Sequence, residues 1–467
     1  MRYISTRGEA PALGFSEAML AGLARDGGLY VPLATPRVTE GEVRALAGLP
    51  YARAAARIAQ PFVGEDVDAT DLAALSDDAY AGFRHAATAP LIQLDNNLFL
   101  LELFHGPTLA FKDFAMQWLG RLMNRALQER DAHATILGAT SGDTGAAAIE
   151  AFGGLSQTEV FILFPQGRVS DVQRRQMTTV DKPNVHAVAI EGTFDDCQSI
   201  VKALFNDLAF RDEMSLSGVN SINWARILAQ IVYYFTSAVT LGAPDRRVSF
   251  ATPTGNFGDV LAGYYAKCMG LPIERLTIAT NENDILARAL ATGVYRPLGV
   301  RATQSPSMDI QISSNFERLL FEAYDRDAAA VRALMGGLAQ SSEFAIAAGP
   351  LAAIRRDFDA FRVDEAACAE EIGRVYRETD VVIDPHTAIA VSAARRAQQR
   401  DPATPMVALA TAHPAKFPDA VERAIGKRPG LPPHLSDIGV RRERFSVLPN
   451  DPGAVARFVR QRARVAA

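Results

Sequence analysis

Hydrophobic residues follow two different patterns along the chain, and the pattern changes near residue 96. Residues 1–95 carry apolar positions at helical spacing, as in EGEVRALAGL and EDVDATDLAALS. After that point, short uninterrupted apolar runs end in Gly, Ser, Thr or Asn and lead into helical patterns. Strands without alternation, interleaved with helices, are typical of parallel sheets covered on both faces. The pattern therefore predicts an α/β fold preceded by a mainly helical amino-terminal domain.

Composition is that of a globular protein and argues against a nucleic-acid partner. Of the 467 residues, 48% are hydrophobic and 22% are charged, and the net charge is −5 with both signs mixed along the chain. No basic region is available for a nucleic-acid backbone, so we expect no such partner. A chain of this length predicts two or three domains.

Apolar segments and cysteines indicate the compartment. No run of 18 uncharged apolar residues occurs, and no long apolar segment follows the early arginines, so we expect a cytoplasmic protein with no membrane partner. The three cysteines lie far apart, with no CxxC and no histidine at ligand spacing. They are predicted to be reduced thiols in the core, and no metal site is expected.

Lys112 lies in an apolar segment, FHGPTLAFKD at residues 104–113. An unpaired ammonium is costly to bury, so this side chain either extends to water or has a lowered pKa and attacks a carbonyl as a nucleophile. The following stretch, DFAMQWLGRLMNRALQER, predicts a helix with Asp113 at its amino terminus. Lys112 would then lie just before the helix, where the dipole lowers the pKa of the amine further.

Two loops that follow predicted strands suit anions. TPTGNFGD, residues 252–259, combines two glycines with the start of a helix and has the outline of a phosphate cradle. The alternative is a tight turn in which Asp259 caps the helix. GATSGDTGAAA, residues 138–148, offers hydroxyls and free amides for a carboxylate or phosphate. It equally fits a glycine-rich turn with Ser141 or Asp143 as the cap.

A third loop adds one hydroxyl. Thr411 directly follows the strand MVALA and either contacts a ligand or caps a turn, whereas Asp384 and His386 most simply start a helix. A lysine in an apolar setting, a phosphate cradle, a hydroxyl-rich loop and a further hydroxyl form a specific set. Pyridoxal phosphate, with its aldehyde, phosphate and ring nitrogen, needs these groups, and an imine bond would take up the Lys112 amine.

Four motifs, HGPTLAFKD, GATSGDTGAA, TGNFGD and TAHPAKF, resemble in this order those of the threonine synthase family, in its bacterial and fungal branch. The resemblance extends from MRYISTRG through TAHPAKFP, most of the chain. It implies a pyridoxal-phosphate enzyme of the tryptophan synthase β-like fold (fold type II). It also implies a carbon–oxygen lyase that converts O-phospho-L-homoserine and water into L-threonine and phosphate, the last step of threonine biosynthesis.

The resemblance also implies residue roles. Lys112 would bind the cofactor covalently and then act as the base for the α-proton, and Thr411 would face the pyridine nitrogen. The cofactor phosphate would be held by Gly255, Asn256, Phe257, Gly258 and Asp259. From the hydroxyls and free amides of its own loop, we expect the substrate carboxylate to bind at Thr140, Ser141, Gly142, Asp143 and Thr144. Relatives in the wider fold usually have an asparagine at position 143 that reaches the phenolic oxygen of the cofactor, so the aspartate leaves that contact unassigned.

The substrate brings a second phosphate, which needs its own site. Candidates lie in SPSMDIQISSNFER and NSINWAR, because an arginine with hydroxyl and amide donors suits a phosphate dianion. These candidates are Ser307, Asn315 and Arg318 in the first stretch, and Asn223 and Arg226 in the second. Each of them is equally explained as a surface or capping residue of an ordinary helix.

Two lobes of mainly parallel sheet flanked by helices are expected after the amino-terminal domain, 1–95. Residues 96–118 and 241–430 would form the large cofactor-binding lobe, and residues 119–240 a small mobile lobe that closes to keep water out until elimination is complete. Residues 431–467 would form a carboxyl-terminal segment that ends in a helix with an Asp-Pro start. A monomer or small homo-oligomer is expected.

Other functions differ from this prediction in testable ways. A serine or threonine dehydratase, or a β-replacement enzyme of the same fold, would give other products. A catalytically silent binding protein would have no reason to keep a buried lysine. A nicotinamide dehydrogenase is disfavoured, because TGNFGD supplies only G-x-x-G and no acidic residue ends a strand about 20 positions later.

Overall fold

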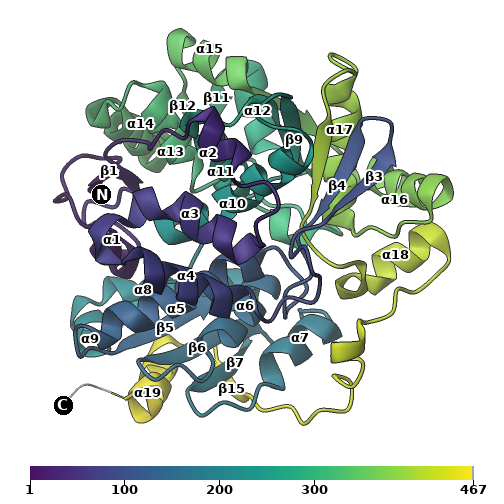
Figure 1. The fold of residues 1–467 in the computed structure, drawn as a ribbon. Helices are drawn as coiled ribbons and strands as arrows, with labels where there is room; N and C mark the ends of the chain where they lie inside the picture. Colours follow the sequence, from purple (N-terminus) through teal and green to yellow (C-terminus); the bar gives the residue numbers. More distant parts are fainter. Residues whose placement is uncertain (465–467) are drawn as a thin grey trace.

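Two mainly parallel sheets form the framework of the computed structural model, which describes residues 1–464 (Figure 1). The larger sheet has the order β13-β10-β9-β14-β4-β3, in which only β3 is antiparallel to its neighbour. The smaller sheet, β15-β7-β6-β5-β8, is parallel throughout. Two lobes of parallel sheet, as predicted from the uninterrupted apolar runs, are confirmed.

The strands of the larger sheet are β3 (Leu91–Asp95), β4 (Leu98–Glu102), β9 (Val248–Pro253), β10 (Ile273–Thr280), β13 (Phe358–Arg362) and β14 (Met406–Ala410). Those of the smaller sheet are β5 (Ala134–Ala139), β6 (Thr158–Pro165), β7 (Val185–Glu191), β8 (Leu216–Ser217) and β15 (Ser446–Pro449). Two short pairs are β1 (Tyr3–Ser5) with β2 (Tyr30–Pro32) and β11 (Val294–Tyr295) with β12 (Phe344–Ala345). Every residue of β6 is buried, because helices cover both faces of the smaller sheet.

Helices pack around both sheets. In the first half of the chain these are α1 (Phe15–Ala21), α2 (Glu40–Arg44), α3 (Tyr51–Val63), α4 (Ala69–Tyr80), α5 (Lys112–Gln128), α6 (Asp143–Phe152), α7 (Asp171–Thr178), α8 (Phe194–Asn206), α9 (Leu208–Glu213) and α10 (Trp224–Thr240). In the second half they are α11 (Gly258–Met269), α12 (Ile285–Thr292), α13 (Phe316–Ala323), α14 (Ala328–Ser341), α15 (Ala348–Asp357), α16 (Glu365–Thr379), α17 (Pro385–Gln398), α18 (Pro418–Ile425) and α19 (Pro452–Arg462). Short 3-10 turns are η1 (Gly64–Asp66), η2 (Pro306–Met308), η3 (Pro414–Lys416) and η4 (Pro433–Leu435).

The amino-terminal segment is mainly helical, as expected, and packs on the helices that carry the site. Apolar residues at helical spacing in α3 (Ala55, Ile58, Ala59 and Phe62) are buried. The indole of Trp118 in α5 donates to the Ser76 hydroxyl of α4 at 3.0 Å. The segment does not end as an independent unit at residue 95, because β3 pairs with β4 in the larger sheet. Its apolar face therefore braces α5 and α10 from outside.

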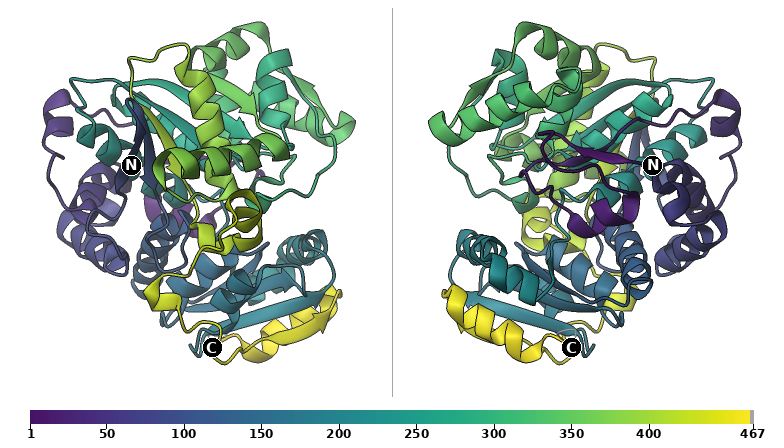
Figure 2. Two further views of the ribbon diagram at one scale, coloured as in Figure 1. Left: turned by 90° about the vertical axis from the view of Figure 1, so that its right-hand side faces the viewer. Right: turned by 90° about the vertical axis from the view of Figure 1, so that its left-hand side faces the viewer.

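The carboxyl-terminal segment returns to the smaller sheet (Figure 2). β15 pairs with β7, and α19 packs against α8. The Asp451 carboxylate caps α19 by accepting the amides of Gly453 and Ala454, each at 3.0 Å. The predicted closing helix is confirmed, and its sheet strand is an addition that the pattern of residues 431–467 did not reveal.

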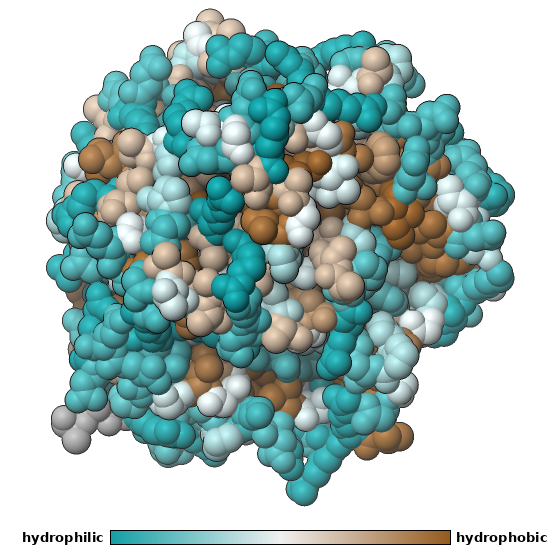
Figure 3. All heavy atoms as spheres, in the orientation of Figure 1, coloured by the Kyte–Doolittle hydropathy of each residue, from teal (hydrophilic) through white to brown (hydrophobic). Residues whose placement is uncertain are grey.

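Hydrophilic residues cover most of the molecular face in Figure 3, with hydrophobic residues in small groups between them. Exposed apolar residues in small groups are normal on a globular surface. Among the helices of residues 1–464, none combines the length and apolar character needed to span a bilayer.

Candidate active site

Lys112 is buried at the start of α5, with 8% of its surface exposed. The helix begins at Lys112 itself, one residue earlier than predicted, and Asp113 does not cap it. The Asp113 carboxylate instead accepts the amide and hydroxyl of Thr108, at 2.8 and 2.6 Å. A Cβ on Gly106 would lie 2.5 Å from that carboxylate, so the glycine permits the close approach. The loop before Lys112 is thus pinned to the first turn of α5.

The end of β14 lies directly beside Lys112. The Phe111 amide donates to the Thr411 carbonyl at 2.9 Å, and Ala110 forms a bridge with Ala412. Thr411 is 6% exposed. The structure therefore brings together Lys112 and Thr411, which are far apart in the sequence, at the carboxyl edge of the larger sheet, where ligands bind in such folds.

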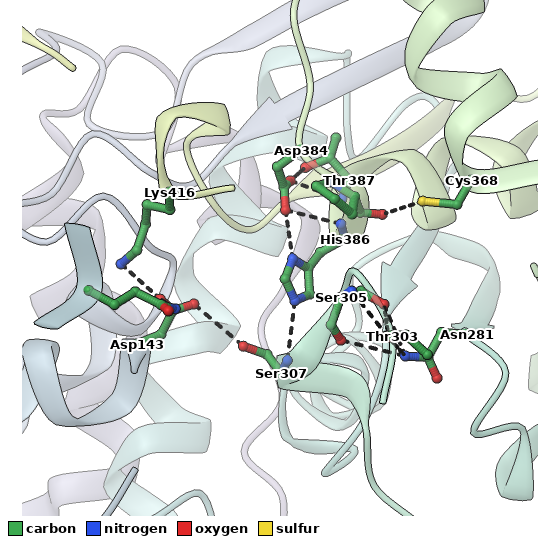
Figure 4. Close-up of polar contacts among 12 residues, drawn as sticks. Asp143, Asn281, Thr303, Ser305, Ser307, Cys368, Asp384, His386, Thr387 and Lys416 are labelled. Carbon is green, nitrogen blue, oxygen red and sulfur yellow. Dashed lines mark hydrogen bonds and ion pairs between the residues drawn. The ribbon is translucent and has the colours of Figure 1, made fainter. Parts of the chain in front are cut away.

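Asp143, the first residue of α6, is the junction of the site (Figure 4). Its Oδ2 lies 3.5 Å from Lys112 Nζ, and its Oδ1 lies 2.8 Å from Lys416 Nζ. Gln173 of α7 donates to Oδ1 at 2.9 Å, and the Ser307 hydroxyl lies 3.4 Å from Oδ2. Lys416 and Gln173 were not predicted as site residues. TAHPAKF, however, places Lys416 among apolar residues much as FHGPTLAFKD places Lys112, and that signal could have identified it.

The charges around Lys112 oppose one another. Burial lowers the pKa of the Lys112 amine, Asp143 opposes this effect, and the nearby cations Lys416 and Arg226 lower the pKa further. Burial alone would raise the pKa of Asp143, but Lys416 and Lys112 outweigh it and hold that pKa well below its usual range. Asp143 is therefore a carboxylate, and Lys112 loses its proton more readily than an exposed lysine.

Residues 255–259 form an anion cradle between β9 and α11. Phe257 adopts the left-handed conformation at φ 65°, and within the described residues the five amides of this stretch donate to no protein acceptor. A Cβ on Gly255 would meet the Ser307 carbonyl at 3.0 Å. Free amides at a helix amino terminus, with a tight space at position 255 that favours glycine, fit a phosphate group.

Asp259 points away from this cradle. Its Oδ1 accepts the hydroxyls of Tyr233 and Tyr234 at 2.6 and 3.1 Å, and burial raises its pKa to about 7. No side chain caps α11, so the alternative of a turn capped by Asp259 is wrong. Asp259 can therefore contact a phosphate through its backbone amide but not through its side chain.

The hydroxyls of the loop at residues 138–148 have different roles. Thr140 accepts the amides of Gly142 and Gly145 at 3.0 and 2.9 Å, so its hydroxyl holds the turn. The glycine-rich turn that opens a helix is therefore present, but no side chain caps α6. Ser141 and Thr144 are half-buried, and both lie at the amino terminus of α6 beside Asp143. They are the members of the loop with hydroxyls left for a ligand.

Asp384 and His386 start α17, as expected, and also support the site. Asp384 caps the helix through the amides of His386 and Thr387, each at 3.0 Å. The His386 ring accepts the Ser307 amide at Nε2, 3.3 Å away, and its Nδ1 lies 2.6 Å from Asp384. This arrangement fixes the proton on Nδ1 and ties η2, which carries Ser307, to α17 (Figure 4).

Arg318, Asn223 and Asn315, three of the predicted phosphate ligands, are occupied by protein contacts. Arg318 is fully buried and donates to the carbonyls of Tyr30 and Ile222. Asn223 caps α10 by accepting the Ala225 amide at 3.0 Å, and Asn315 donates to the Asn256 carbonyl at 3.1 Å. These three residues join the amino-terminal segment, α10 and the cradle. Their geometry gives no support to a direct contact with substrate.

Arg226 differs from Arg318 in having few partners. It is 3% exposed, and within residues 1–464 the only hydrogen bond of its guanidinium runs from Nη1 to the Val219 carbonyl at 3.2 Å. Its Nε has no partner among those residues, and burial lowers its pKa to about 10. A buried guanidinium with unused donors beside Lys112 is suited to a ligand anion. Arg226 and Ser307 are the two phosphate candidates that the geometry keeps at the site.

Comparisons with known proteins cover the whole chain. The family description "Threonine synthase N terminus" matches residues 2–80, "Pyridoxal-phosphate dependent enzyme" matches 84–412, and "Threonine synthase, C-terminal" matches 387–459. A threonine synthase of Pseudomonas aeruginosa is 52% identical over 99% of this chain and 98% of its own. The chain belongs to the threonine synthase family. It is therefore a member of a pyridoxal-phosphate-dependent enzyme family, as the motifs predicted.

Solved structures of threonine synthases confirm the fold. The pyridoxal-phosphate-bound threonine synthase of Brucella melitensis is 59% identical, with a TM-score of 0.97 over 100% of both chains. The yeast threonine synthase is 40% identical, with a TM-score of 0.93 over 99% of this chain and 98% of that one. A threonine deaminase of Solanum lycopersicum, at 14% identity and a TM-score of 0.50, shares the fold alone. The dehydratase alternative gains no support beyond the fold.

Proposed function

We propose that this chain is a threonine synthase, which converts O-phospho-L-homoserine and water into L-threonine and phosphate by γ-elimination followed by β-addition. The observation that carries the proposal is the buried Lys112 beside a five-amide cradle, in a chain similar over its whole length to threonine synthases. Bound pyridoxal phosphate would supply an electron sink beside the substrate amine, so that protons on neighbouring carbons can leave.

Three groups of this chain would hold the cofactor. Lys112 would bind its aldehyde, and the amides of residues 255–259 would hold its phosphate against the amino terminus of α11. The backbone of Thr411 is held by the hydrogen bond from the Phe111 amide to the Thr411 carbonyl, and its hydroxyl would face the ring nitrogen. A neutral hydroxyl does not require that nitrogen to be protonated.

Lys112 would then move protons at the substrate α carbon. Burial and the neighbouring cations lower the pKa of its amine, which increases the fraction of neutral base near neutral pH. The Asp143 carboxylate, whose Oδ2 lies 3.5 Å from Lys112 Nζ, orients the amine and stabilises its protonated form. Lys112 can therefore both accept a proton and return it.

Two anchors would bind the substrate. The hydroxyls of Ser141 and Thr144, at the amino terminus of α6, suit the carboxylate. The free donors of Arg226 suit the phosphate, with the Ser307 hydroxyl as a second donor. Because α6 packs on the smaller sheet and Ser307 lies beside the cradle, a substrate that contacts both would draw the lobes together and exclude water.

The experiment is product analysis in ¹⁸O-labelled water. Purified protein loaded with pyridoxal phosphate should convert O-phospho-L-homoserine into threonine that carries one ¹⁸O in its hydroxyl, and the released phosphate should be unlabelled. This labelling follows because the carbon–oxygen bond at the γ carbon breaks and water adds at the β carbon. Oxo acid and ammonia from threonine or serine, with no threonine from phosphohomoserine, would instead establish a dehydratase.

We further infer a cytoplasmic enzyme that is a monomer or a small homo-oligomer. Its three free cysteines, two of them buried, suit a reducing compartment. Light scattering coupled to size-exclusion chromatography measures the mass, and a species above a tetramer would contradict the inference.

A further inference from the structure

A second buried lysine, Lys416, lies on the side of Asp143 opposite Lys112. It ends η3, which follows β14 and the loop that begins at Thr411. Its side chain is fully buried, and its Nζ lies 2.8 Å from Asp143 Oδ1 and donates to the Thr108 carbonyl at 2.7 Å. Figure 4 shows its amine directed at the carboxylate. None of the roles proposed above uses this residue.

Stability alone does not explain this ion pair. A fully buried salt bridge is often no more stabilising than apolar residues of the same shape, because both ions lose their hydration. The carboxylate is instead held in one orientation from several sides. Gln173 and Lys416 bind Oδ1, and Oδ2 is left facing Lys112 with Ser307 at 3.4 Å.

We propose that Lys416 is a positioning residue for Lys112. Lys416 binds one oxygen of Asp143 so that the other oxygen faces the Lys112 amine. The charge of Lys416 also offsets much of the carboxylate charge that this amine meets. The inference rests on the proposed role of Lys112. Its test, however, reads the ionisation of Lys112 in cofactor-free protein, so it can succeed or fail whatever the substrate proves to be.

Charged and titratable groups face Lys112 from four elements. These groups are Asp143 of α6, Lys416 of η3, Arg226 of α10 and Asp259 of α11. Neutralising Lys416 leaves the Asp143 charge unopposed, so Lys112 should hold its proton to higher pH. Neutralising Asp143 leaves Lys112 beside a second cation, so it should lose its proton at lower pH. Neutralising both should nearly cancel the two effects.

The test is competitive labelling of cofactor-free protein with trace acetic anhydride over a pH series, with the acetylated Lys112 peptide quantified by mass spectrometry. Lys416→Met should raise the midpoint of Lys112 labelling by about one pH unit. Asp143→Asn should lower it, and Asp143→Asn/Lys416→Met should bring it back toward the original value. The control is Lys202→Met, which removes an exposed lysine of α8 and should leave the midpoint unchanged.

A purely structural role predicts something different. Folded Lys416→Met protein with a lower Tm and an unshifted Lys112 midpoint would overturn the proposal. If Lys416→Met does not fold, Asp143→Asn and the double variant carry the test, and equal midpoints in those two would overturn it. A shifted midpoint in Lys416→Met, together with no threonine formation by the original protein loaded with pyridoxal phosphate, would keep the positioning role and refute the proposed function.

Discussion

Replacing Arg226 by methionine tests the proposed substrate phosphate site most sharply. Methionine keeps much of the length of the side chain and removes the charge and all its donors. Of the two buried arginines Arg226 and Arg318, only Arg226 has donors free for a ligand within the described residues. Arg318 donates hydrogen bonds to the carbonyls of Tyr30 and Ile222. Arg226→Met should therefore impair catalysis, and Arg318→Met should impair folding.

The magnitude follows from the two nitrogens of Arg226, Nε and Nη2, that are free within the described residues. A hydrogen bond to a charged group contributes about 1.5 to 3 kcal/mol, so two of them to a phosphate contribute about 3 to 6 kcal/mol. With a tenfold change for about 1.4 kcal/mol, kcat/KM for O-phospho-L-homoserine should fall by about two to four powers of ten. Stability should not fall in parallel, since the variant no longer buries a poorly paired charge.

The assay measures phosphate release across substrate concentrations and Tm by calorimetry, for the original protein, Arg226→Met and Arg226→Lys. Arg226→Lys keeps the charge but not the fork, so it should retain part of the activity. Arg226→Met with kcat/KM within fivefold of the original protein would refute the assignment. A large loss of Tm in the same variant would show that Arg226 is structural.

Three further changes test other parts of the account. Gly255→Ala, whose Cβ would meet the Ser307 carbonyl at 3.0 Å, should weaken pyridoxal-phosphate binding by about tenfold in an absorbance titration; undiminished affinity would contradict the cradle. Arg318→Met should lower the free energy of unfolding in urea by about 3 kcal/mol, since buried carbonyls lose their donors; an unchanged value would contradict this reading. Burial raises the pKa of Asp259 to about 7, so the folded state still holds a proton that the unfolded state has released above about pH 4. Stability therefore falls as pH rises from about 4 to about 7. Asp259→Asn should lack this fall and gain stability relative to the original protein between those pH values, and parallel pH profiles would contradict the buried-carboxyl account.

The loops at the strand ends could be predicted because their signals are local. Uninterrupted apolar runs followed by glycine and hydroxyl residues predicted the cradle after β9, the turn after β5 and Thr411 after β14. In parallel sheets the strand direction alone brings such loops to one edge. The buried Lys112 was likewise predicted from its immediate neighbours.

The partners of charged side chains could not be predicted, because they come from distant parts of the chain. Arg226 and Arg318 are alike as sequence signals, and they differ because the Tyr30 carbonyl, 288 positions before Arg318, accepts hydrogen bonds from Arg318. Asp259 turns inward because Tyr233 and Tyr234 of α10 offer hydroxyls. Asp113 binds Thr108 instead of capping α5 for the same kind of reason, since the loop geometry that brings them together depends on Gly106.

Mapping the covalent attachment site tests the central claim most directly. Protein incubated with pyridoxal phosphate, reduced with borohydride and digested should yield a phosphopyridoxyl group on the Lys112 peptide. Lys416, whose amine lies at the other oxygen of Asp143, provides the internal comparison and should remain unmodified. Label on Lys416 alone, or no label on Lys112 with excess pyridoxal phosphate, would contradict the account.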